Sequence, residues 1–490
     1  MGDHFSGLPP EIVQKIFVHC LPTTEGWWRE HSRNMLNPTW APVLLMHVCS
    51  RWRKLTLDCS GLWTDFTFNL VSYDPGLTSV ELSRLQSRKW EEISLWNRAR
   101  KDFLISLSVR IRDRLHSHNL SSDAPARWSE HVKAIVIDNA IRLQRLRLEC
   151  RFMEAAAFFD LPSEKLVNLQ CLDLSDMAYQ DFVVASQRLS TVPRIQRLAV
   201  RLHGHDLNNV NPTFPTWSHL RVLVLEGSTG VSFRSILQNC RNLEQLSTSV
   251  LRPDTSSPLH GHVVARNLVA LSVAFDVESD PSFFKDISFP MLTRLRIACI
   301  EYSRTFSWGN SKHFPRHSHF LSQLGSLKTL ILSFLDICGA DLLQLLSSMP
   351  NLERLVVDSE LQTHTSFLAG LIFTPEKPLL AKLRHFKLCI DLTSASTYPS
   401  FERTLEELGP AVFQMILSRL SSSGFPTIDC CPEPLQRVQL VHTDHPMFND
   451  RMHTALTVPP EVEPFMAGID FSVERPIDDS AWAPDEIVVW

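Results

Sequence analysis

An apolar phrase, L-x-x-L-x-L, recurs eleven times along the chain and constrains its fold more than any other feature. Successive phrases begin 23 to 31 residues apart in eight of the ten intervals. The last two apolar residues of each phrase are two positions apart, which places both on one face of a short strand. The phrases begin at Leu143, Leu169, Ile195, Leu220, Leu243, Leu268, Leu292, Leu327, Leu352, Leu383 and Leu435.

A helical period lies between some of the phrases. One apolar face is formed by Phe233, Ile236, Leu237 and Cys240, and Leu342 begins a second face of the same kind. The pattern predicts a helix before each strand. A single unit cannot bury its own apolar face, so the units are expected to stack.

The spacing of the phrases is typical of a leucine-rich repeat. We therefore predict an α/β fold, in which an irregular solenoid has a curved parallel sheet inside and helices outside. The Asn or Cys that normally follows the repeat strand is mostly missing, and the 52-residue interval before Leu435 leaves room for an inserted helix near 413–420. The alternative is an α/β globule in which the phrases are unrelated core strands.

Composition excludes several functional classes. The 490 residues include 16 Gly and no G-x-G, which disfavours a nucleotide-binding enzyme. Eleven Cys without a C-x-x-C pair indicate a reducing compartment, so we expect an intracellular protein of the cytoplasm or nucleus. No uncharged apolar run reaches the roughly 18 residues of a membrane span. A net charge of −5 gives no reason to expect nucleic-acid binding.

The sequence contains no convincing catalytic or metal motif. Histidines cluster at 313–319, 203–205 and 260–262, without Cys or acid at the spacing of metal ligands. The vicinal pair Cys430 and Cys431 has no identifiable base beside it. There is no G-x-S-x-G and no H-E-x-x-H. We therefore predict no catalytic residue, no metal and no cofactor.

The segment 8–57 differs from the rest of the chain. Prolines precede an amphipathic helix that begins near Glu11, and two further helical patterns begin near Ala41 and Val48. Fifty residues of short helices bury little surface, so this module is expected to hold a partner against its spare apolar face. The alternative is that it only caps the solenoid.

These residues carry a family resemblance. The segments Leu8–Ile12, Val48–Arg53 and Leu62–Trp63 resemble the F-box, especially that of fungal F-box proteins, over about residues 5–68. The resemblance implies binding to the Skp-type adaptor of a cullin-RING ubiquitin ligase, with the repeats capturing the substrate. It places the adaptor-binding residues at Leu8, Pro9, Ile12, Ile16, Phe17, Val48, Cys49 and Trp52. The 22–40 segment is longer than in a compact F-box.

We predict four regions: an F-box module at 1–68, a connecting segment with the first irregular units at 69–140, the solenoid at 141–442, and an acidic tail or cap at 443–490. From Asp444 onward there are 2 basic and 10 acidic residues, a local charge of −8. Its Phe465, Phe471 and Trp482 are expected to anchor it on the last repeat, or the tail covers the inner face as a lid.

In each phrase the third, fifth and seventh positions point away from the core. These positions hold nine basic residues and four acids, a charge of +5 that suggests an acidic or phosphorylated protein segment as ligand. The alternative is an ordinary solvated strand face. The acids are Glu149, Asp173, Glu226 and Asp358. The candidate substrate-binding residues are Arg145, Arg147, Arg197, Arg201, Arg294, Arg296, Arg354, Lys387 and Arg437.

Two functions follow from these observations. The first is a non-catalytic substrate receptor of a Skp/cullin/F-box ubiquitin ligase, which would bind an adaptor, through it a cullin, and a protein substrate. The second is a leucine-rich-repeat interaction scaffold that is not engaged in ubiquitin ligation. An enzyme on an α/β core is a distant third.

Overall fold

The chain forms two compact units in the computed structural model, one from Met1–Thr229 and one from Gly230–Val489. The structure describes residues 7–21, 41–73, 103–113, 135–150, 152–203, 215–227, 233–249, 262–275, 286–299, 322–333, 339–360, 364–374, 378–391, 401–420, 432–442 and 456–474, with single positions at 84, 87, 91, 94, 96, 133, 284, 320, 376 and 454.

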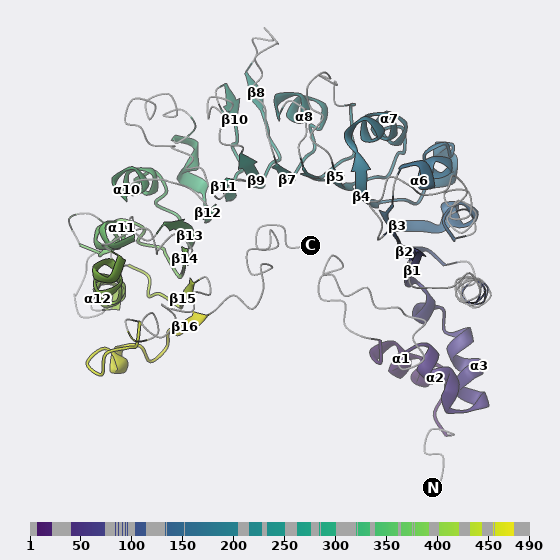
Figure 1. Cartoon of the computed structure of the whole chain (residues 1–490), viewed down its shortest axis with the longest axis horizontal. Helices are drawn as coiled ribbons and strands as arrows, with labels where there is room; N and C mark the ends of the chain where they lie inside the picture. The colour runs from purple at the N-terminus through teal and green to yellow at the C-terminus, as the bar shows by residue number, and fades with distance from the viewer. Residues whose placement is uncertain are drawn as a thin grey trace. The chain divides into compact units, whose positions relative to one another are not determined.

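The amino-terminal unit combines three short helices with a parallel sheet of order β1-β2-β3-β4-β5-β6 (Figure 1). The helices before the sheet are α1 (Pro10–His19), α2 (Val43–Val48), α3 (Ser50–Asp58) and the 3-10 turn η1 (Ser60–Trp63). The strands are β1 (Asp65–Tyr73), β2 (Ile105–Asp113), β3 (Leu143–Glu149), β4 (Cys171–Ala178), β5 (Arg197–His203) and β6 (Val222–Glu226). The connections contain η2 (Ile137–Arg142), α6 (Phe152–Phe159), η3 (Ser163–Leu166) and α7 (Tyr179–Leu189).

The carboxy-terminal unit has a parallel sheet of order β7-β9-β11-β12-β13-β14-β15-β16, with its helices on the convex face (Figure 1). Its strands are β7 (Gln245–Ser249), β9 (Ala270–Phe275), β11 (Arg294–Cys299), β12 (Thr329–Ser333), β13 (Arg354–Glu360), β14 (His385–Asp391), β15 (Arg437–His442) and β16 (Asp470–Glu474). The connections contain α8 (Phe233–Asn239), β8 (Val263–Val264), β10 (Ile287–Ser288), η6 (Gln323–Ser326), α10 (Gly339–Ser347), α11 (His364–Leu371), α12 (Phe401–Leu420) and η10 (Glu463–Phe465).

The core confirms the phrase pattern. The first, fourth and sixth positions are buried in all eleven phrases, and Thr248 is the one non-hydrophobic residue among them. Each fully buried leucine contributes about 2 kcal/mol by leaving water. The strands that carry the phrases run parallel within each unit, so the α/β fold with a long parallel sheet is confirmed and has the character of a leucine-rich repeat.

The prediction of a helix before every strand holds only in part. Both predicted helical faces are buried, as Ile236 on α8 and Leu346 on α10 show. Before β9 and β11, however, the described residues form the short parallel strands β8 and β10. A strand suits these two connections because Val263 and Ile287 are β-branched residues that bury one side of the chain.

Asparagines tie neighbouring repeats together at a place that sequence analysis did not anticipate. Asn168, Asn267 and Asn351 each stand one residue before a phrase and donate from Nδ2 to a backbone carbonyl of the preceding repeat. The distance is 2.7 Å from Asn351 Nδ2 to the Gly325 oxygen. These side chains satisfy backbone acceptors at the turns into the strands, although the usual residue after the strand is missing.

The predicted inserted helix is present as α12, which is longer than expected. Its Arg419 is 1% exposed, and the guanidinium donates to the carbonyl oxygens of Leu371, Leu379 and Leu380. Burial lowers the pKa of Arg419 to about 10. The buried guanidinium thus fastens α12 to the end of α11 and to the turn before β14.

The sheets extend beyond the predicted solenoid. Strands β1 and β2 precede residue 141, and β16 follows residue 442 and pairs with β15. The four predicted boundaries remain predictions. The tail therefore contributes a strand to the sheet of the carboxy-terminal unit.

Candidate functional site: the inner strand face

We define the inner face as the third, fifth and seventh positions of the phrases, on the side of each sheet opposite its helices (Figure 1). The strand register aligns equal positions of neighbouring repeats, so each position forms a row across the strands. Neighbouring strands lie about 4.8 Å apart, which sets the spacing along a row.

The charges are segregated between the rows. The third positions carry five arginines and no acid, a charge of +5. The fifth positions carry three basic residues and one acid, and the seventh positions carry one basic residue and three acids, so their charges are +2 and −2. The basic character of the inner face therefore belongs mainly to the third-position row, where the chain enters each strand.

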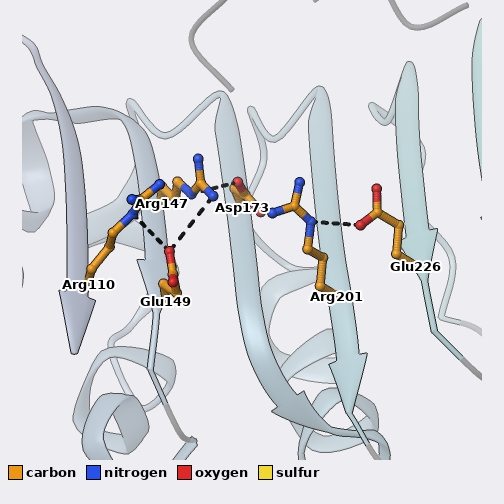
Figure 2. A network of polar contacts seen from close by, with 6 residues as sticks. All are labelled: Arg110, Arg147, Glu149, Asp173, Arg201 and Glu226. Carbon is orange, nitrogen blue, oxygen red and sulfur yellow. Dashed lines mark hydrogen bonds and ion pairs between the residues drawn. The ribbon is translucent and has the colours of Figure 1, made fainter. Parts of the chain in front are cut away.

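In the amino-terminal unit the fifth and seventh positions form an internal charge network (Figure 2). Arg147 Nε lies 3.3 Å from Asp173 Oδ2, and Arg147 Nη2 lies 3.8 Å from Glu149 Oε2. Arg110, on β2, places its Nε 2.8 Å from the same Glu149 oxygen. The arginines of this network therefore form ion pairs with acids of the same unit.

The network continues to β5 and β6. Arg201 donates from Nε to Glu226 Oε2 at 2.7 Å, and in Figure 2 its guanidinium also faces Asp173. Burial lowers the pKa of Arg201, but the attraction of Glu226 and Asp173 outweighs burial and the pKa is raised. The charged form of Arg201 is therefore stabilised by Glu226 and Asp173.

Asp173 lies at the centre of the network and is 1% exposed. Neither carboxylate oxygen accepts a hydrogen bond of good geometry from the residues that the structure describes. Burial raises the pKa of Asp173 to about 6, although Arg147 and Arg201 lower it. The free-energy cost of removing this charged carboxylate from water is larger than the electrostatic stabilisation that Arg147 and Arg201 provide.

The third-position row of the same unit passes through Arg145, Cys171 and Arg197. Burial lowers the pKa of Arg197 to about 10, and the positive charge of Arg145 lowers it further. The charges of Cys171 and Asp173 raise this pKa, but they do not outweigh burial. Burial raises the pKa of the Cys171 thiol despite the two flanking arginines, so Cys171 is not an activated nucleophile.

The carboxy-terminal unit has a longer third-position row. By register it runs through Arg294, Thr329, Arg354, His385 and Arg437, with arginines on alternate strands. Arg437 Nε lies 3.1 Å from Asp470 Oδ2 on β16. We call the five residues from Arg294 to Arg437 the arginine row.

Burial and the neighbouring arginines both favour the neutral form of the histidine in this row. Burial is the main cause that lowers the pKa of His385. The positive charges of Arg354, Arg437 and Arg384 lower it further, whereas the negative charge of Glu353 raises it. Neutral His385 leaves the row with three cationic side chains. All three are at least partly exposed to solvent.

The nine predicted substrate-binding residues thus fall into different settings. Arg147 is 5% exposed and paired with two acids, and Arg201 is paired with Glu226. Lys387 and Arg296 stand at fifth positions and are half-buried. The remaining five stand in the third-position rows of the two units: Arg145, Arg197, Arg294, Arg354 and Arg437.

The predicted adaptor surface is divided between the exterior and the core. On α1 Ile12 is 43% exposed and on α2 Val48 is 55% exposed, whereas Phe17 is fully buried. Pro9 and Cys49 are exposed, and Leu8, Ile16 and Trp52 are half-buried. Ile12 with Ile16, and Leu44 with Val48, each lie four residues apart and so share a helix face.

The three helices are held together by specific contacts. The Phe17 and Trp52 rings lie 4.8 Å apart between centroids, and Arg51 Nη2 donates to the Leu8 carbonyl oxygen at 3.1 Å. Cys49 Sγ accepts from Trp52 N at 3.4 Å and caps α3. Phe17 therefore belongs to the module's core, and the other predicted residues frame its exterior.

The aromatic anchors predicted in the tail differ from one another. Phe471 is half-buried, and its ring centroid lies 5.9 Å from that of Phe413 on α12. Phe465 is 57% exposed and does not act as an anchor. Trp482 lies outside the described residues, as do His205, His260, the 313–319 histidines and the Cys430–Cys431 pair.

Within the described part of the chain, no three His, Cys, Asp or Glu side chains are arranged to hold a metal ion. No described helix is long and apolar enough to cross a membrane.

Comparisons with known proteins add little. No family model matches the sequence, and no curated protein matches it. Among solved structures, a Bacteroides fragilis protein is 11% identical with a TM-score of 0.31, over 64% of this chain and 75% of that one. A Leptospira interrogans leucine-rich-repeat protein is 14% identical with a TM-score of 0.23, over 84% of this chain and 91% of that one. Such weak similarity supports no functional conclusion.

Proposed function

We propose that this chain is the substrate receptor of a Skp/cullin/F-box ubiquitin ligase, in which the 1–68 module binds a Skp-type adaptor and the repeats bind a protein substrate. The observation that carries the proposal is an apolar exterior on a folded helical module. Ile12 and Val48 are 43% and 55% exposed at positions where the F-box resemblance places adaptor contacts. Exposed apolar side chains grouped on short helices are typical of a binding surface.

The proposed division of labour follows from the positions of the two surfaces. The helical module lies before the sheet, and the stacked Trp63 and Phe66 rings, 5.8 Å apart, join η1 to β1. Trp63 Nε1 also donates to the Thr56 carbonyl at 2.8 Å, which fixes the end of α3. An adaptor on α1 and α2 would thus be carried by a unit that also presents an inner strand face.

The test is co-purification with a Skp-type adaptor. Ile12→Asp and Val48→Asp should abolish it, because each places a charge where an apolar contact is proposed. Val18→Asp is the matched control, since Val18 is 42% exposed on α1 but lies on a different helix face from Ile12. Failure of the wild-type chain to bind any adaptor, or equal loss in all three variants, would contradict the proposal.

The second candidate is an interaction scaffold that does not engage the ligase. It is favoured by the short second helix, since α2 has only six residues and follows a long 22–40 segment. A scaffold would bind its protein ligand through the repeats with no adaptor present in the purified complex. Mass spectrometry of that complex from cells separates the two candidates.

A further inference from the structure

Two exposed arginines lie on neighbouring turns of the carboxy-terminal unit, at the edge where the chain enters its strands. Arg241 stands two residues before the Leu243 phrase, and Arg266 stands two residues before the Leu268 phrase. Asn267 Nδ2 donates to the Arg241 carbonyl oxygen at 3.3 Å, which ties the two turns together. The strands that follow these turns are neighbours, about 4.8 Å apart.

Neither arginine is engaged within the protein. Both side chains are exposed, and among the residues that the structure describes neither guanidinium forms an ion pair or a hydrogen bond. Glu244, which follows the first of the two turns, is half-buried and has another partner. In this respect the two arginines differ from Arg437, which is paired with Asp470. Two like charges on adjacent turns repel each other, so an anion bound beside them is attracted by both.

An exposed apolar side chain lies on the next turn. Met291 stands one residue before the Leu292 phrase, at the position that Asn267 takes in the preceding repeat. The Thr293 amide donates to the Val269 carbonyl oxygen at 3.0 Å, so these two repeats are aligned where their strands begin. Met291 is 57% exposed, as much as any large apolar side chain that the structure describes. A methionine is unbranched and adapts its shape to the side chain of a partner.

We propose that Arg241, Arg266 and Met291 form a docking site, the edge site, for a protein segment in which acidic residues directly precede an apolar one. The two guanidinium groups bind carboxylates of the segment, because the planar fork of arginine matches the two oxygens of a carboxylate. Met291 covers the apolar residue that follows. The inference rests on the proposed function only in taking a protein as the ligand, and it adds a contact outside the inner face.

A nucleic acid fits the edge site less well. Its backbone carries one charge per 3.4 Å of each strand in duplex form, so it is bound best by a continuous basic track. At the equivalent positions before β12 and β13 the chain has Gly325, Ser326, Pro350 and Asn351, none of which is charged. Two cations beside an apolar side chain favour a short acidic and apolar peptide instead.

The test uses synthetic peptides and the full chain. The probe is a fluorescein-labelled peptide with Asp-Asp-Leu at its centre and Gly-Ser flanks. One control peptide has Asn in place of both Asp residues, and a second has Ser in place of Leu. By fluorescence anisotropy the probe should bind about tenfold more tightly than the Asn peptide and about threefold more tightly than the Ser peptide. Raising the ionic strength to about 1 M should remove the first difference and keep the second.

Matched variants locate the site. Arg241→Gln and Arg266→Gln should each weaken binding of the probe about tenfold, because each removes a charged donor. Met291→Ser should weaken it about threefold through loss of the apolar contact. Lys382→Gln is the control, because Lys382 is exposed on the same edge but donates to Asn351 Oδ1 at 2.7 Å. Its affinity should change less than about twofold. All four substituted side chains are exposed, so the variants should keep the melting temperature of the wild type.

Four results would overturn the proposal. They are a dissociation constant of the wild type for the probe above about 1 mM, equal affinity for the probe and the Asn peptide, equal losses in Arg266→Gln and Lys382→Gln, or tighter binding of a thymidine oligonucleotide. None depends on adaptor co-purification, so failure of the edge site and failure of the proposed ligase function are distinguishable.

Discussion

The inner faces of the two units use the same repeat positions in different ways. In the amino-terminal unit, arginines at the fifth and seventh positions meet acids from neighbouring strands, and Arg147 and Asp173 are 5% and 1% exposed. In the carboxy-terminal unit, the arginines stand mostly in the third-position row, where Thr329 and His385 lie between them and Arg437 pairs with Asp470 on β16.

This difference separates charge that is buried in the protein from charge that keeps contact with solvent. A buried pair must satisfy its own electrostatics, because water cannot compensate it. A solvent-exposed pair, such as Arg437 with Asp470, is screened by water and contributes less to stability. The net charge of +5 on the inner face is therefore a poor guide to what each charge does, and the burial of each charged side chain is a better one.

The largest expected effect is the loss of Arg147. Arg147→Ala leaves Asp173 and Glu149 short of a buried partner, which should lower the free energy of unfolding by about 3 kcal/mol or more. Lys387→Ala, at the equivalent fifth position of a repeat in the other unit, should cost less than about 1 kcal/mol. Urea unfolding monitored by circular dichroism measures both, and equal losses would erase the proposed distinction.

The pH dependence of Asp173 gives the next largest effect. Its pKa is raised from 3.8 to about 6 in the folded chain. The folded state therefore holds a proton between about pH 4 and pH 6 that the unfolded state has lost, and stability from this group is lost as pH rises through 6. The predicted loss is about 3 kcal/mol across that window.

Asp173→Asn isolates this contribution, because an amide does not titrate. The unfolding free energy of the variant relative to wild type should increase as pH rises from about 4 to about 6.5. A difference that stays flat across the series would show that Arg147 and Arg201 hold the carboxylate charged throughout. Such a result would make the network a source of stability rather than a strained buried charge.

The repeat fold was predictable because its signal is periodic and redundant. Eleven phrases predicted the strands, and every apolar position in them is buried. The Asn before the phrase was visible in the similar sequences around Asn242 and Asn351, but its hydrogen bond to the preceding repeat was not predicted. A side chain that bonds to a backbone carbonyl one repeat away leaves no apolar period to detect.

The candidate site was predictable only as a set of positions. Sequence spacing placed Arg147 and Arg201 on the inner face, but it could not show that Asp173 and Glu226 would engage them. Which acid meets which arginine depends on the strand register, because the register determines which residues of neighbouring strands lie side by side. Arg110 was missed because the phrase in β2, Leu104-x-x-Leu107-x-Val109, was not among the eleven that were recognised, although Arg110 stands at its seventh position.

The smallest expected effect concerns the pair at the carboxy-terminal edge. Arg437 and Asp470 lie 3.1 Å apart, as close as the buried pair, but their side chains are 49% and 63% exposed. Asp470→Asn should therefore lower the unfolding free energy by less than about 1 kcal/mol, because water screens the attraction.

Salt separates the exposed pair from the buried one. Raising ionic strength to about 1 M shortens the screening length to about 3 Å, so the small cost of Asp470→Asn should vanish while the cost of Arg147→Ala persists. A loss above about 2 kcal/mol that salt leaves unchanged would mean that the edge pair is as structural as Arg147 and Asp173, and the contrast between the units would fail.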